Sequence, residues 1–178
     1  MGRLILVTGG ARSGKSDFAL QLAQSLPAPR CFIATCPVVD SEMDERIARH
    51  REERAGAEWR TVEEQTAIAA ILRARQDHPV CLIDCLTLWV NNLLYLAEQS
   101  GTMFSDSEMR QQCDLLIQAA VEHHGAVICV TNEVGMGIVP DNSAARLYRD
   151  LVGRCNRMLA AAASEVYLVS CGIPLRLK

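Results

Sequence analysis

"LVTGGARSGKS", residues 6–16, joins an apolar run to a glycine-rich turn and to the start of a helical pattern. The turn matches the P-loop pattern, GxxxxGK followed by Ser or Thr, with the strand before it and the helix after it that the motif requires. Its glycines let backbone amides face phosphate oxygens, Lys15 reaches the outer phosphates and Ser16 can hold Mg²⁺. A chance glycine turn is the alternative. The motif predicts a nucleotide phosphate site formed by Gly9, Gly10, Ala11, Arg12, Ser13, Gly14, Lys15 and Ser16.

Short apolar runs typical of fully buried strands alternate with helical patterns along the chain. The predicted strands are residues 4–8, 31–35, 80–84, 126–131 and 166–170. The predicted helices are residues 16–25, 41–54, 63–75, 86–98, 106–123 and 144–163. This alternation predicts an α/β fold with a mostly parallel central sheet flanked by helices on both faces. A Gly-Ile-Pro break at residues 172–174 separates two apolar runs, which predicts a C-terminal hairpin that adds an antiparallel edge.

The length of 178 residues fits one nucleotide-binding domain over residues 1–178, with no internal repeat, low-complexity tract or linker. The formal charge is −3, no block of like charge occurs and aromatic residues are few. The composition therefore suggests neither a nucleic-acid groove nor a membrane surface. We expect a small-molecule partner.

The eight cysteines form no CxxC pair and no Cys/His spacing typical of zinc. Most lie in apolar runs, and a chain of this length does not need disulfide bonds, so we expect reduced thiols in the cytosol. The N-terminal apolar run is too short for a signal peptide, and the later ones are interrupted by charge, Asn or Gly. The predicted localisation is cytoplasmic, without membrane insertion.

A carboxylate ends the predicted strand 80–84. A P-loop enzyme needs a second carboxylate at the tip of a neighbouring strand to hold the metal and its water shell. Asp84 would be costly to bury there unless a cation or solvent satisfied it. We therefore predict Ser16 and Asp84 as the Mg²⁺ ligands. As an alternative or additional role, Asp84 caps the helix predicted from residue 86.

Two further strand ends are expected at the same edge of the sheet, where ligands bind in doubly wound folds. After the second strand, Ala34, Thr35 and Cys36 offer small side chains and backbone groups. After the fourth, residues 132–137 either line a substrate pocket or form an ordinary turn, and the sequence leaves both open. The polar and turn-forming residues of this stretch are Asn132, Glu133, Gly135 and Gly137.

"DERIARHREER", residues 44–54, surrounds one imidazole with charge. Helical spacing places on one stripe the residues Met43, Ile47, His50 and Arg54. By itself, a histidine on such a partly apolar stripe is more typically a packed or hydrogen-bonded side chain. A run of mixed charges is more typically a solvated helix face. Near a phosphate, however, the flanking arginines would lower the pKa of His50 and keep its ring neutral, as attack on a nucleotide phosphate requires. Structural explanations suffice for His78, His123 and His124.

Nearly end to end, the chain resembles the bifunctional adenosylcobinamide kinase/adenosylcobinamide-phosphate guanylyltransferase family of cobalamin biosynthesis. The resemblance rests on LVTGGARSGKS, FIATCPVVDSEMDERIARHREER, WRTVEE, IDCLTLWVNNLL, TNEVGMGIVP and AAAASEVYLVSCGIPLRLK, in the family's order. It implies an enzyme that phosphorylates the aminopropanol hydroxyl of adenosylcobinamide with GTP or ATP. A second step would carry GMP from GTP on an enzyme histidine to the new phosphate, giving adenosylcobinamide-GDP and pyrophosphate.

The resemblance also implies roles for individual residues. The guanylylated histidine falls on His50, and Lys15 joins it as the second catalytic residue. Beyond the P-loop, the implied nucleotide contacts fall on Ala34, Thr35, Cys36, Arg51, Glu52, Glu53, Arg54, Glu63 and Asp84. The resemblance further implies a RecA-like P-loop fold that assembles as a trimer. Nothing in the composition or the residue spacing indicates the trimer. Cys36 and Met136 depart from the residues common in relatives, but neither is a reacting group.

Attack by an imidazole nitrogen on the α-phosphorus makes a phosphoramidate, which is reactive enough to pass GMP on. Two alternatives remain open. One is a monofunctional P-loop kinase for another small metabolite, in which His50 is structural. The other is a nucleotide-hydrolysing switch or assembly protein, against which stands the lack of a basic stripe or a large insertion for a partner.

Overall fold

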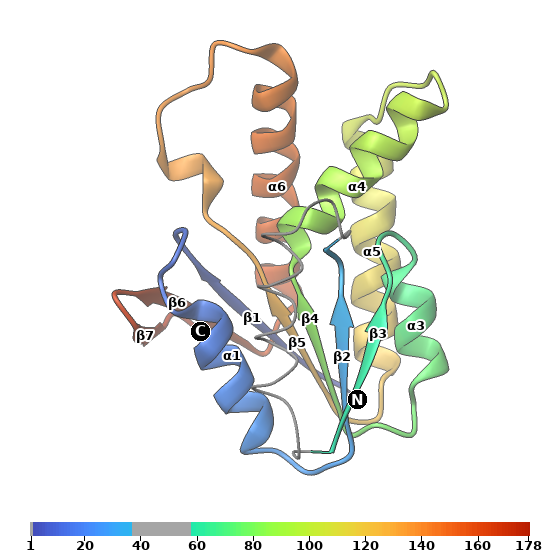
Figure 1. The fold of residues 1–178 in the computed structure, drawn as a ribbon, viewed down its shortest axis with the longest axis vertical. Helices are drawn as coiled ribbons and strands as arrows, with labels where there is room; N and C mark the ends of the chain where they lie inside the picture. Colours follow the sequence, from blue (N-terminus) through green and yellow to red (C-terminus); the bar gives the residue numbers. More distant parts are fainter. Residues whose placement is uncertain (1, 37–57) are drawn as a thin grey trace, which may run out of the picture.

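A computed structural model of the protein describes residues 2–36 and 58–178 (Figure 1). These residues form a seven-stranded sheet in the order β3-β2-β4-β5-β1-β6-β7. All neighbouring pairs are parallel except β6 and β7, which are antiparallel. The strands are β1 (Arg3–Gly9), β2 (Arg30–Ala34), β3 (Trp59–Glu63), β4 (Val80–Asp84), β5 (Ala126–Val130), β6 (Glu165–Ser170) and β7 (Ile173–Arg176).

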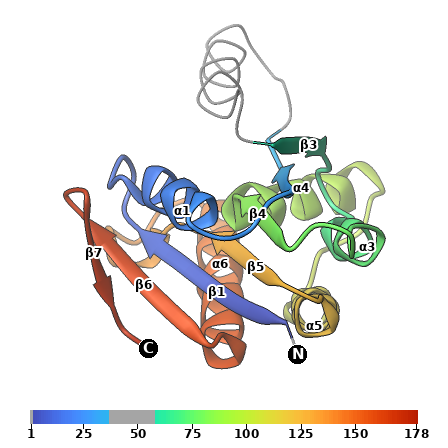
Figure 2. The same ribbon diagram turned by 90° about the horizontal axis from the view of Figure 1, so that it is seen from below.

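Helices cover both faces of the sheet. Figure 2 shows α1 on one side of the strands and α5 and α6 on the other. In Figure 1, α4 and α6 extend beyond the carboxyl ends of the parallel strands. The helices are α1 (Lys15–Gln24), α3 (Ile68–Ala74), α4 (Leu86–Gln99), α5 (Asp106–Glu122) and α6 (Ser143–Ala162), with a short 3-10 helix, η1 (Val134–Met136), after β5.

Alternate side chains of the central strands enter two cores, one on each face of the sheet. Ile5 and Val7 of β1 belong to the core on the α1 face. Leu4 and Leu6 belong to the larger core, which also contains buried residues of α3, α4, α5 and α6. This alternation fixes the face on which each strand end presents its polar residues.

The fold predicted from the sequence is confirmed for the described residues. The predicted strand 80–84 has the bounds of β4, and the other four differ from β1, β2, β5 and β6 by one residue at one or both ends. The predicted helices 16–25, 86–98, 106–123 and 144–163 match α1, α4, α5 and α6 equally closely. The antiparallel C-terminal hairpin is present as β6 and β7. The predicted helix 41–54 lies outside the described residues.

One prediction is wrong. The helix expected from residue 63 begins only at Ile68, because residues Trp59–Glu63 form β3, which the sequence did not predict. β3 lies at the edge of the sheet, and each of its side chains is exposed or half-buried. It therefore lacks the continuous apolar run by which buried parallel strands are recognised. Its position is set by pairing with β2, from Arg30 opposite Trp59 to Ala34 opposite Glu63.

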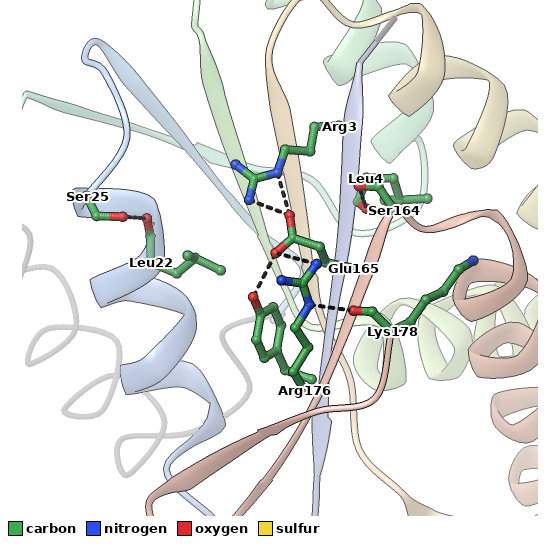
Figure 3. Close-up of polar contacts among 9 residues, drawn as sticks. Arg3, Leu4, Leu22, Ser25, Ser164, Glu165, Arg176 and Lys178 are labelled. Atoms are coloured by element: carbon green, nitrogen blue, oxygen red, sulfur yellow. Dashed lines mark hydrogen bonds and ion pairs between the residues drawn. The ribbon is translucent and has the colours of Figure 1, made fainter.

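A buried carboxylate joins the N-terminal strand to the C-terminal hairpin (Figure 3). Glu165, which is 6% exposed, accepts hydrogen bonds from Arg3 Nε at 2.6 Å and from the Tyr167 hydroxyl at 2.7 Å. Arg176 of β7 lies 3.9 Å from the same carboxylate. Burial alone would raise the pKa of Glu165, but the hydrogen bonds from Tyr167 and Arg3 outweigh it and lower that pKa. The folded protein therefore stabilises the ionised form.

Replacing Glu165 by glutamine is expected to lower the free energy of unfolding at neutral pH by about 1–2 kcal/mol, because hydrogen bonds to a charged acceptor are lost while the exposed arginines are partly screened. Since the folded-state pKa is lowered, the wild type has the full contribution above about pH 4.5 and loses it as the pH falls through the folded-state pKa. Urea unfolding at neutral and acid pH measures both effects. Glu98→Gln, a change at an exposed position of α4, is the control. A difference from wild type that does not shrink in acid would contradict this assignment.

Candidate functional site

The predicted P-loop is a turn between β1 and α1. Gly14 occupies the N-cap of α1 with φ +88°, a left-handed conformation that favours glycine. A side chain at Gly9 would lie 2.4 Å from the Val169 carbonyl oxygen, so this position also requires glycine. Lys15 is 9% exposed, and its Nζ donates to the Gly10 carbonyl at 3.2 Å. The loop thus presents a helix N-terminus and a buried ammonium at the carboxyl edge of the sheet, which suits polyphosphate binding.

Two distant segments hold the P-loop in place. The Gly172 amide, in the turn between β6 and β7, donates to the Ser13 carbonyl at 2.8 Å. The Glu133 amide, after β5, donates to the Gly9 carbonyl at 3.1 Å. The Ser13 hydroxyl is buried and has no hydrogen-bond partner among the described residues, which leaves it available to a ligand in the loop. The sequence predicted the hairpin as an edge of the sheet but not its contact with the P-loop.

Asp84 lies at the end of β4, in register with Ala34 of β2 and Val130 of β5. β5 separates β4 from the P-loop strand, so the two lie about 10 Å apart, which leaves room for phosphates and a hydrated cation between them. By strand alternation Asp84 follows Val80 and Leu82, which belong to the core on the α1 face. The helix-cap alternative for Asp84 is wrong, because Cys85 occupies the N-cap of α4.

Thr35, at the end of β2, is fully buried and bonded to β4 and α4. Its hydroxyl accepts from the Cys85 amide and donates to the Cys85 carbonyl, both at 2.8 Å, and its own carbonyl accepts from Asn92 Nδ2 at 2.8 Å. In this arrangement Thr35 fixes the backbone that carries Asp84. Ala34 and Cys36 on either side are half-buried. A nucleotide contact by these three residues stays a prediction.

Glu63 ends β3 in register with Ala34, and its side chain is exposed at the same edge of the sheet. The structure therefore brings together the P-loop, Asp84, residues 34–36 and Glu63, which lie far apart in the sequence. His50 and the neighbouring residues Arg51, Glu52, Glu53 and Arg54 lie outside the described residues, so their predicted roles stay predictions.

A network of polar side chains supports this edge from the α6 face. Thr131 donates to Asn156 Oδ1 at 2.7 Å, and Asn156 Nδ2 donates to the Asn132 carbonyl at 3.0 Å. Asn132 Nδ2 in turn donates to the Thr87 hydroxyl at 3.2 Å. Sequence reasoning considered Asn132 but not Thr87 or Asn156. The only sequence signal for Thr87 and Asn156 is that each is a polar residue within the apolar pattern of a helix.

Burial and hydrogen bonding account for the other potentially reactive side chains among the described residues. Burial, with the nearby Asp84 charge, raises the pKa of the Cys85 thiol, which therefore stays neutral beside the site. His123 is buried, accepts from the Gly125 amide at 3.0 Å and lies 3.3 Å from the Arg75 carbonyl. All eight cysteines lie within the described residues, and none of them forms a disulfide there.

No group of three or more His, Cys, Asp or Glu side chains in residues 2–36 and 58–178 is arranged to hold a metal ion by itself. In the same ranges, every helix is too short or too polar to cross a membrane.

The chain matches known proteins over nearly its whole length. A family model described as cobinamide kinase / cobinamide phosphate guanyltransferase (CobU) matches residues 5–177. The bifunctional adenosylcobalamin biosynthesis protein CobU of Salmonella typhimurium is 42% identical over 98% of this chain and 99% of its own length. The protein of the same name from Escherichia coli matches equally well. The corresponding protein CobP of Pseudomonas aeruginosa is 40% identical over 97% of this chain and 96% of its own.

Solved structures with the same fold are much more distant in sequence. The RadB recombinase is 17% identical, with a TM-score of 0.53 over 94% of this chain and 74% of its own. An ATPase from a bacterial type III secretion system is 13% identical, with a TM-score of 0.63 over 99% of this chain and 57% of its own. At these identities the likeness establishes a RecA-like P-loop fold and nothing about substrates.

Proposed function

The chain belongs to the CobU family of cobinamide kinase/cobinamide phosphate guanyltransferase enzymes, and from this we propose that it makes adenosylcobinamide-GDP in two steps at one nucleotide site. The first step transfers the γ-phosphoryl group of a nucleoside triphosphate to the hydroxyl of adenosylcobinamide. The second transfers GMP from GTP, through a guanylyl intermediate on His50, to the phosphate just formed, with release of pyrophosphate.

The observation that carries the proposal is the full-length similarity to bifunctional relatives in a chain whose P-loop has an intact phosphate-binding geometry. The Lys15 ammonium bonds the Gly10 carbonyl and lies where it can turn to the outer phosphates of a nucleotide. Gly14 opens α1, whose first amides face the loop. These residues bind and orient the nucleotide, and they provide positive charge for the phosphoryl group in transfer.

For the second step, the proposed nucleophile is an imidazole nitrogen of His50. It forms a bond to the α-phosphorus as the bond to the bridging oxygen breaks and pyrophosphate leaves. In this proposal Arg51 and Arg54 neutralise phosphate charge, and Glu63 and residues 34–36 contact the nucleotide. The exposed position of Glu63 and the half-buried positions of Ala34 and Cys36 at the nucleotide edge support this assignment.

The described residues fit a magnesium ion held between protein and nucleotide. Ser16 lies in the first turn of α1, and Asp84 ends β4 on the same face of the sheet. A hydroxyl, one carboxylate and phosphate oxygens are the oxygen ligands that Mg²⁺ prefers. When bound, Mg²⁺ would neutralise charge on the phosphates. Ser16 and Asp84 would orient it.

Asp84→Asn is expected to raise the Mg²⁺ concentration needed for half-maximal phosphorylation roughly tenfold or more, because the amide keeps the shape of the side chain but loses its charge. Titrating the kinase reaction with MgCl₂ at saturating nucleotide measures the change. Asp141→Asn, in the exposed loop before α6, is the matched control. An unchanged Mg²⁺ titration would mean that Asp84 is not a ligand of Mg²⁺.

A product assay tests the proposed function. Purified protein is incubated with adenosylcobinamide, GTP and Mg²⁺, and the products are identified by mass spectrometry. Adenosylcobinamide phosphate together with adenosylcobinamide-GDP is the expected result. Phosphate product without adenosylcobinamide-GDP would indicate a kinase alone. Nucleotide hydrolysis without either product would indicate a switch or assembly protein.

We also propose that the protein forms a homo-oligomer, with a trimer implied by the family resemblance. In support, α4, α6 and the α4–α5 loop border a groove of about 650 Å³ with apolar side chains. Tyr95, Met103 and Leu147 on this groove are exposed by 61%, 84% and 37%. Contiguous exposed apolar surface of this kind is typical of interaction sites. Cytoplasmic localisation and the absence of a nucleic-acid partner stay predictions.

A further inference from the structure

The segment between β5 and η1 carries a carboxylate, Glu133, that the proposed function leaves without a role. Glu133 is half-buried, and its Oε1 accepts from the Thr8 hydroxyl at 2.8 Å and from Asn156 Nδ2 at 3.3 Å. Its backbone amide bonds the carbonyl of Gly9, the first P-loop glycine. Both the backbone and one carboxylate oxygen of Glu133 are therefore fixed beside the phosphate site.

The charge of Glu133 has no structural partner in the part of the chain that the structure describes. Within residues 2–36 and 58–178 it forms no ion pair, and only neutral groups donate to its Oε1. Its Oε2 accepts no hydrogen bond there. A glutamine would accept equally well from Thr8 and Asn156, and a half-buried carboxylate without a cation costs free energy. Neither of these two contacts within the described residues requires a negative charge at position 133.

Glu133 approaches the carboxyl edge from the face opposite to the nucleotide-binding residues. Its partner Thr8 follows Leu4 and Leu6, which belong to the core under α5 and α6, and its partner Asn156 lies on α6. Lys15 and Asp84 belong to the α1 face. A transferred phosphoryl group has its attacking and leaving oxygens roughly in line, so an acceptor enters opposite the nucleotide. With a nucleotide bound on the α1 face, such an acceptor would come from the α6 face, on which the partners of Glu133 lie.

We propose that Glu133 is the general base of the kinase step, an inference that rests on the proposed function. The hydroxyl oxygen of the corrinoid substrate forms a bond to the γ-phosphorus, and the bond from that phosphorus to the β,γ-bridging oxygen breaks. The nucleoside diphosphate leaves, and the hydroxyl proton passes to Oε2 of Glu133. Thr8 and Asn156 hold Oε1, so that Oε2 faces the acceptor.

The two half-reactions are expected to differ in whether they need Glu133 as a base. In GMP transfer the acceptor is a phosphate monoester, which is largely ionised at neutral pH and needs no base. Self-guanylylation involves an imidazole nitrogen and likewise no hydroxyl proton. Only phosphorylation of the alcohol depends on Glu133.

The test measures three reactions of Glu133→Gln beside the wild type. These are phosphorylation of adenosylcobinamide, covalent labelling by α-labelled GTP, and GMP transfer to adenosylcobinamide phosphate that has been prepared beforehand. The kcat of phosphorylation is expected to fall about 10²-fold or more, with the KM for nucleotide within about twofold. Labelling and GMP transfer should stay within about threefold of wild type, and they also show that the variant is folded. Asp141→Asn should match the wild type in all three.

Each other outcome overturns the inference. Phosphorylation by Glu133→Gln within threefold of wild type would make the network purely structural. An equal loss in all three reactions would mean that Glu133 only supports the P-loop through Thr8 and Gly9. A wild-type protein that fails to phosphorylate adenosylcobinamide would instead refute the proposed function, so the two failures are distinguishable.

Discussion

His50→Ala abolishes covalent labelling by GTP labelled on the α-phosphate and abolishes GMP transfer to adenosylcobinamide phosphate, if the proposed nucleophile is correct. Phosphorylation of adenosylcobinamide survives at a normal or reduced rate, because Lys15 and the P-loop act on the γ-phosphoryl group without an enzyme nucleophile. Labelled protein is separated from free nucleotide by gel electrophoresis, and the corrinoid products are quantified by mass spectrometry. The wild-type adduct should be lost in acid and persist in alkali, as expected of a phosphoramidate.

His124→Ala is the matched control for this experiment. His124 is exposed just after α5, and its backbone amide donates to Gln76 Oε1 at 3.2 Å. This variant should label and transfer GMP as the wild type does. Wild-type labelling of His50→Ala, or an adduct that survives acid, would mean that another residue is the nucleophile and that His50 has only a structural role.

Lys15→Ala is expected to reduce both half-reactions by roughly 10²-fold or more, because one nucleotide site serves each in the proposed function. The lysine is 9% exposed within the P-loop, and no other lysine of the chain lies near this edge. Loss of its ammonium removes the point charge that the outer phosphates require. Rates of phosphorylation and of GMP transfer, each at saturating GTP and Mg²⁺, measure the effect.

The chain offers an internal control, since its second lysine is the terminal Lys178. Its Nζ donates to the carbonyls of Ala160 and Ala161 near the end of α6, at 3.3 and 2.9 Å. Lys178→Ala should therefore leave both activities unchanged. If Lys15→Ala retained one activity near the wild-type level, that activity would belong to a second nucleotide site.

The parts of this protein that follow from the sequence are those encoded in contiguous stretches. The P-loop is predictable because Gly9 and Gly14 meet backbone requirements within one turn, a close contact at the first and a positive φ at the second. The central strands are predictable because a strand buried on both faces is an uninterrupted apolar run. β3 is not, because an edge strand with exposed side chains has no such pattern and is defined by its pairing with β2.

The family, and with it the predicted role of His50, also follows from the sequence, because the motifs around this residue are contiguous. Residues 50–54 are not among those that the structure describes, so that part of the site stays a prediction. Ser16 opens α1 and Glu63 ends β3 at the nucleotide edge, and their roles likewise stay predictions.

Only the tertiary structure decided which distant residues meet at the phosphate site. Asp84 is brought opposite the P-loop because β5 inserts between β4 and β1. Thr8, Glu133 and Asn156 meet because β1 and β5 end at the same edge and α6 passes that edge before it leads into β6. Gly172 reaches Ser13 because the terminal hairpin folds back beside β1. Local sequence determines backbone conformation and apolar pattern. A hydrogen bond between residues more than a hundred positions apart depends on strand order and register, which no single stretch of the chain contains.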